Sequence, residues 1–155
     1  MSAYIKLKKI FREASLSSDI AGILHWDMST MMPSKSRNQR AEQLAYLSKL
    51  SHDKVSSNEV RDLIFEAKSE ELNQNDLQNL REIEREHKLA SSVPSDLVQK
   101  ISRTAAKCEG EWEEARKNSN FNLIKNSLDE LINLTREEAD ILGKEFNLSP
   151  YEALV

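Results

Sequence analysis

Glycine and proline are scarce in this sequence of 155 residues, which contains only three of each. Turns between strands usually need these residues, and here long helix-forming runs separate the few that occur. The scarcity argues against a sheet-rich fold and predicts an all-α protein. We expect about six helices, several of them long, in an antiparallel array or bundle. The length suits one hydrophobic core, so we expect a single helical domain over residues 1–155.

Cysteine and long apolar runs are also nearly absent. The one cysteine, Cys108, excludes an intramolecular disulfide and fits a reducing compartment. The apolar run Ile20–Leu24 is too short for a signal core or a membrane span. We therefore expect a cytoplasmic protein without a membrane partner.

No basic stripe runs along the sequence. The formal net charge is −4, and acidic and basic residues alternate as they do on solvated helix faces. A nucleic-acid surface needs clustered cations to neutralise phosphates, so we expect no nucleic-acid partner.

Catalytic motifs are missing as well. His25, His52 and His87 belong to three different expected helices, and no His-Glu-x-x-His pair occurs. Cys108 lies on an apolar stripe without a neighbouring histidine, which indicates a buried, inert thiol. Glu84 and His87 form one Glu-x-x-His unit, but di-metal bundles use two, so a di-metal bundle is the weakest alternative. We expect no catalytic and no metal-binding residue in this chain.

Apolar residues three and four positions apart predict the helices. The first runs from about 3 to 31, the fifth from 94 to about 117 and the sixth from 121 to about 146; Ser149-Pro150 starts another. Ser36 with Gln39, Ser56 with Glu59, and Asn73 with Asp76 are expected to cap the second, third and fourth helices. The residues expected to face inward include Leu7, Ala14, Leu24, Met28, Leu44, Leu63, Leu77, Leu80, Ile83, Leu97, Ala105, Trp112, Ile124, Ile132 and Leu142.

The stretch Leu24–Pro33 combines a tryptophan, an aspartate and three methionines with a proline that ends the first helix. We expect the other helices to pack around it, with Trp26 and Asp27 setting how the first two helices cross. Asp27 is either an active carboxylate or, as we prefer, the partner of Arg37, Arg40 or Arg116. Gly22, inside the first helix, either lets another helix approach closely or is a tolerated defect.

Several motifs in order resemble the opening of the carboxypeptidase Taq family. They are Leu24-x-Trp26-Asp27-x-x-Thr30-x-Met32-Pro33, Arg40-Ala41-Glu42-Gln43-Leu44-Ala45, Val93-Pro94-x-x-Leu97-Val98, Trp112-x-x-Ala115-Arg116 and Tyr151-Glu152-Ala153-Leu154. The residues that carry the resemblance, which we expect to be structural, are Trp26, Asp27, Thr30, Met32, Pro33, Arg40, Gln43, Trp112 and Arg116.

The resemblance implies an all-helical, zinc-dependent metallocarboxypeptidase that removes residues from peptide C-termini, usually as a homodimer. The family's zinc motif lies in a much longer C-terminal part that continues past the segment ending here at Val155. We therefore expect a truncated chain that forms the wall or lid of the substrate groove, holds no zinc itself and is inactive alone. Its partners would be a second copy or a chain with the catalytic part. The alternative is a helical assembly module.

Overall fold

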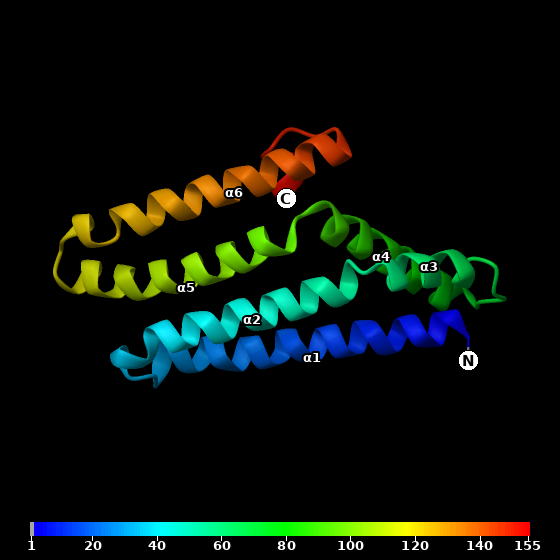
Figure 1. Cartoon of the computed structure of the whole chain (residues 1–155), viewed down its shortest axis with the longest axis horizontal. Helices are drawn as coiled ribbons and strands as arrows, with labels where there is room; N and C mark the ends of the chain where they lie inside the picture. Colours follow the sequence, from blue (N-terminus) through cyan, green and yellow to red (C-terminus); the bar gives the residue numbers. More distant parts are fainter. Residues whose placement is uncertain (1) are drawn as a thin grey trace.

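The computed structural model describes residues 2–155, and over that range it contains helices, turns and no strand (Figure 1). This confirms the all-α expectation. The helices are α1 (Ala3–Thr30), α2 (Arg37–Val55), α3 (Asn58–Ala67), α4 (Gln74–Ser92), α5 (Ser95–Lys117) and α6 (Lys125–Phe146). Three short 3-10 helices complete the chain: η1 (Ser34–Ser36), η2 (Phe121–Leu123) and η3 (Glu152–Leu154).

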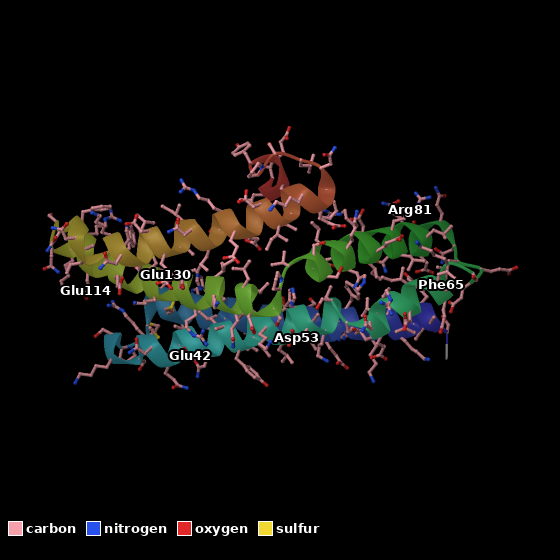
Figure 2. All side chains as sticks on the ribbon, turned by 45° about the horizontal axis from the view of Figure 1, so that its top comes forward. Glu42, Asp53, Phe65, Arg81, Glu114 and Glu130 are labelled. Carbon is pink, nitrogen blue, oxygen red and sulfur yellow. The ribbon has the colours of Figure 1, made fainter. Side chains whose placement is uncertain are left out.

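Four long helices lie side by side in the order α1, α2, α5, α6, each antiparallel to the next (Figure 1). α2 is the central element, because it packs along both α1 and α5. The pair α3 and α4 covers the N-terminal half of α1 at one end of the array. We call the opposite end, formed by the turns at residues 31–36 and 118–124, the tip. Figure 2 places Glu114 toward the tip and Phe65 and Arg81 at the other end.

The core consists of several apolar clusters spaced along the array. The cluster at the α3–α4 end is built around the fully buried side chains of Leu7 and Val60. Toward the tip, Ala41 and Leu44 of α2 meet Ala106 of α5, with Leu24 and Met28 of α1 packed against them. Small side chains at these contacts let α1 and α5 approach α2 closely, and close packing of this kind is typical of protein interiors.

The helix starts differ in part from the expected caps. Asn73 accepts a hydrogen bond from the Asp76 backbone N–H, as expected. Ser57, not Ser56, caps α3 by accepting from the Val60 N–H. Ser36 caps nothing with its side chain, because η1 leads directly into α2 with helical backbone angles at Ser36. η2 likewise replaces the expected first turn of α6, which begins at Lys125.

Some residues expected to face inward are exposed. They are Trp112, Leu77 and Ile132, and Trp26 is exposed as well. Each lies at the edge of an apolar stripe, where the periodicity alone does not define the width of the buried face. Cys108, by contrast, is a buried free thiol as expected. No helix in the described part of the chain is long and apolar enough to cross a membrane.

Candidate functional site

Asp27 and Arg40 join α1 to α2 near the tip. The Arg40 guanidinium donates to an Asp27 carboxylate oxygen over 2.6 Å and also to the Leu24 carbonyl oxygen. Its Nε donates to the side-chain oxygen of Gln43, and the Arg40 side chain is only 14% exposed. Of the three arginines expected as partners, Arg40 is therefore the one that pairs with Asp27. A charge-assisted bond at a half-buried site fixes the crossing of these helices.

The turn between α1 and α2 keeps two further motif residues in place. The Met32 backbone N–H donates to the Asp27 carbonyl oxygen over 2.9 Å, and the Thr30 hydroxyl donates to the Trp26 carbonyl oxygen over 2.7 Å. Pro33 follows with an extended backbone and leads into η1. These contacts close the end of α1.

Arg37 lies across α5 at Gly110. A Cβ built on Gly110 would come within 2.8 Å of the Arg37 Cδ, so a larger residue there would make the Arg37 side chain shift. The guanidinium forms ion pairs with Glu113 and Glu114 on the next turn of α5. α2 and α5 are thus joined near the tip by a contact that the residue pattern does not predict, although it shows Gly110 inside a helical run.

The two tryptophans do not form a buried hub. Trp26 is 64% exposed and Trp112 is 47% exposed, which corrects the expectations that the other helices pack around Trp26 and that Trp112 faces inward. Arg116 lies over the Trp112 ring, 5.3 Å from its centroid. The other helices leave these indoles uncovered because α1 and α5 both pack on α2, and the sides that face each other remain open. Asp27, through Arg40, sets the helix crossing without Trp26.

An open groove runs between α1 and α5 with α2 as its floor; we call it the α1–α5 groove. Its inner part is lined by Gly22, His25, Ser48 and Ala105. Nearer the tip, a small separate pocket is lined by residues that include Ser29 and Trp112, and beside it lies a cleft of about 790 Å³ lined by residues that include Met32, Trp112 and Arg116.

Glu109 of α5 bridges the groove in its middle. Its carboxylate lies 3.3 Å from His25 Nε2 and accepts a hydrogen bond from the Ser29 hydroxyl over 3.0 Å. This contact lies between the inner pocket and the pockets nearer the tip. His25, Ser29 and Glu109 thus hold the two walls at a set separation.

The histidine and glutamate side chains that could take part in catalysis or bind a metal either contact other groups or stand alone. His87 Nδ1 lies 2.7 Å from the Val55 carbonyl oxygen, and Glu84 pairs with Lys68, so the Glu-x-x-His unit does not converge on one point. His52 is 10% exposed, and its ring nitrogens have no hydrogen-bond partner within residues 2–155. No group of three potential metal ligands occurs in the described range. The donor set of this chain therefore does not fit a catalytic zinc site, which needs three protein ligands around one point.

The comparisons with known proteins point to one family. The family model described as carboxypeptidase Taq (M32) metallopeptidase matches residues 6–155. The thermostable carboxypeptidase 1 of Pyrococcus furiosus is 31% identical over 86% of this chain, and that of Thermus thermophilus is 27% identical over 91%. The solved structure of BsuCP, 22% identical, superposes on 99% of this chain with a TM-score of 0.90.

All of these proteins are much longer than the chain described here. The matched segment covers 26% of the Pyrococcus furiosus relative, 28% of the Thermus thermophilus relative and 31% of the BsuCP chain. This chain therefore spans less than a third of the length of the relatives it matches.

Proposed function

Since the chain belongs to the carboxypeptidase Taq (M32) metallopeptidase family, we propose that it is the N-terminal helical part of a zinc-dependent carboxypeptidase. The complete enzyme removes residues one at a time from the C-termini of peptides, and this part forms a wall or lid of its substrate groove. The single observation that carries the proposal is the family match over residues 6–155, combined with a coverage of less than a third of each relative.

The chain contributes no catalytic group and works only together with the part that the relatives carry beyond the matched segment. A zinc-bound water is the nucleophile that such a peptidase supplies when its metal is bound. The residues of this chain provide positioning instead: the Asp27–Arg40 and Arg37–Glu113 pairs hold α1, α2 and α5 as one rigid wall. Its single, buried cysteine supports a cytoplasmic location.

An activity measurement with separated parts tests this proposal. The purified chain is mixed with the remainder of the Pyrococcus furiosus relative, meaning everything beyond the segment matched here. Release of the C-terminal amino acid from a short peptide is followed with and without zinc. We expect release only when both parts and zinc are present. Zinc-dependent release by the 155-residue chain alone would contradict the proposal.

A second candidate, a helical assembly module that associates with itself, is favoured by the exposed apolar side chains of α1. Sedimentation velocity of the purified chain over a range of concentrations distinguishes the two. If the chain is a monomer at all concentrations and the Pyrococcus furiosus remainder restores activity, the result supports the proposal of a peptidase part. If the chain forms a concentration-dependent dimer and does not bind the remainder, the result supports the assembly module.

A further inference from the structure

A groove lies between α3 and α4, at the end of the molecule opposite the tip; we call it the α3–α4 groove. Its volume is about 350 Å³, within the range of small-molecule sites in proteins. Residues of both helices line it, among them Arg61, Ile64, Phe65 and Lys68 of α3 and His87 and Lys88 of α4. The four residues of α3 are spaced three, one and three positions apart, so they form one stripe along that helix.

The floor of the α3–α4 groove is apolar and fixed in place. Ile64 is 5% exposed and belongs to the core cluster at this end of the array. The His87 ring is held against the end of α2, because its Nδ1–H donates to the Val55 carbonyl oxygen, which can only accept. Phe65 stands beside this floor with 79% of its surface exposed. An apolar group that covers the Phe65 ring would remove that surface from water, which is favourable.

Cations gather in the groove although the surrounding segment is acidic. Residues 58–92 contain five lysines and arginines and nine carboxylates, which gives a net charge of −4. Three of the five cations line the groove, but only one of the nine carboxylates, Glu84, does so. Glu70 and Asp76 are instead turned toward the first turn of α1, from which they accept hydrogen bonds. The groove therefore has the charge that complements an anion.

Arg61 is the cation of the groove that is most available to a ligand. Lys68 pairs with Glu84 across the groove, and Lys88 lies over the Phe146 ring. Among residues 2–155, Arg61 pairs only with its neighbour in the sequence, and the two side chains are 63% and 65% exposed. Ion pairs as exposed as this one contribute little to stability. A guanidinium has five N–H donors, of which this pair uses two, so Arg61 can also bind the carboxylate of a ligand.

We propose that the α3–α4 groove binds a carboxylate that carries an apolar group, such as a phenyl ring. The apolar group lies on Ile64 and against the Phe65 ring. The carboxylate accepts hydrogen bonds from Arg61, which lies one helical turn from Phe65. A free aromatic acid has this chemistry, and so does the C-terminus of a peptide that ends in an apolar residue. The inference goes beyond the proposed function and does not depend on it, because the groove lies entirely within this chain.

A nuclear magnetic resonance titration of the ¹⁵N-labelled chain tests the proposed site. The two probes are N-acetyl-L-phenylalanine and N-acetyl-L-phenylalaninamide, which share the ring and differ in charge. We expect the acid to bind with a Kd on the order of 1 mM, as suits a ligand of this size, and the amide to bind at least about fivefold more weakly. The largest backbone amide shifts should fall in residues 61–68 and 84–91. Equal affinities for the two probes, or largest shifts elsewhere, would overturn the inference.

Arg61→Gln tests the charged half of the site. It should weaken binding of the acid at least about fivefold and leave binding of the amide unchanged, because only the acid pairs with the guanidinium. Arg81→Gln is the matched control, since Arg81 is an exposed arginine at the same end of the molecule that does not line the groove (Figure 2). It should bind both probes like the wild type. An equal loss of acid binding in the two variants would reduce the effect to net charge and overturn the inference.

Phe65→Ala tests the apolar half of the site. It should weaken binding of both probes by a similar factor, at least about threefold, because both place a ring against Phe65. Phe121→Ala removes another exposed phenylalanine, at the tip, and should bind both probes like the wild type. Melting curves by circular dichroism check that each variant is folded. Unchanged binding by a folded Phe65→Ala variant contradicts the proposed placement of the ring and overturns the inference.

Two further ligands distinguish the sources of the carboxylate. The tripeptide Ala-Ala-Phe and 3-phenylpropionate both carry a phenyl ring and a carboxylate, but only the tripeptide has a peptide backbone. Tighter binding of the tripeptide assigns the groove to peptide C-termini, whereas equal or tighter binding of 3-phenylpropionate assigns it to free acids; both results support the inference. If none of the carboxylates binds the folded chain, the inference is wrong. The proposed function would then still stand, because its activity measurement does not involve this groove.

Discussion

At the scale of single residues, charge pairing and exposure divide the motif Leu24–Pro33 into two parts. Asp27 pairs with Arg40 at a half-buried site, whereas the neighbouring Trp26 ring is exposed to solvent. Sequence proximity therefore does not imply a shared role, because consecutive helix residues point about 100° apart. The pair Asp27–Arg40 joins two helices, whereas Trp26 lies on the exposed surface of α1.

Trp26→Ala should change stability very little. The ring is largely exposed, so its removal opens no cavity, and we expect a loss below about 1 kcal/mol in urea unfolding. Leu7→Ala is the contrasting variant, because Leu7 is 0% exposed and should lose about 2–5 kcal/mol. A loss for Trp26→Ala as large as that for Leu7→Ala would show that the indole is buried after all.

At the scale of elements, capping residues decide where the helices begin. The local sequence can offer more than one candidate capping residue for the same helix. Ser56 and Ser57 both precede α3 and both are good capping residues. Ser57 has the extended backbone that a cap requires, whereas Ser56 still has the helical backbone of the end of α2. The packing of α2 thus selects which serine caps the next helix.

Ser57→Ala should destabilise the protein by about 0.5–2 kcal/mol, because the Val60 N–H loses its acceptor. Ser56→Ala is the matched control and should stay within about 0.5 kcal/mol of the wild type. Chemical unfolding monitored by circular dichroism measures both. A larger loss for Ser56→Ala would place the cap one residue earlier and contradict the structure.

At the scale of the whole molecule, the array leaves charged groups half-buried where another part could cover them. Glu138 on α6 is such a group, since burial raises the pKa of its carboxyl above the ordinary value of 4.5. Within residues 2–155 no cation pairs with it. An acid whose folded-state pKa is raised favours folding below its unfolded pKa and loses that contribution as the pH rises through the folded value.

Glu138→Gln should therefore raise the melting temperature at pH 7–8 and have little effect near pH 4, where the wild-type carboxyl is largely protonated in both states. Other carboxylates also make the stability depend on pH; Glu13 is one, since a hydrogen bond from Lys54 lowers its pKa. Their contributions to the melting temperature cancel when the variant is compared with the wild type at the same pH. The exposed neighbour Glu137→Gln is the control and should melt like the wild type at both pH values. A gain for Glu138→Gln that is the same at both pH values would contradict the role of ionisation.

The sequence by itself determined the helical class, the approximate helix bounds and the family. Helix breakers are rare and apolar spacing is regular, and both are local properties that depend on the chain alone. Asp27 could likewise be narrowed to three arginine partners. Only the tertiary structure decided that Arg40 is the partner, that Arg37 fills the space at Gly110, and that Trp26 and Trp112 stay exposed. Those outcomes depend on where α1 and α5 lie relative to α2, a long-range arrangement that residue spacing along one helix does not encode.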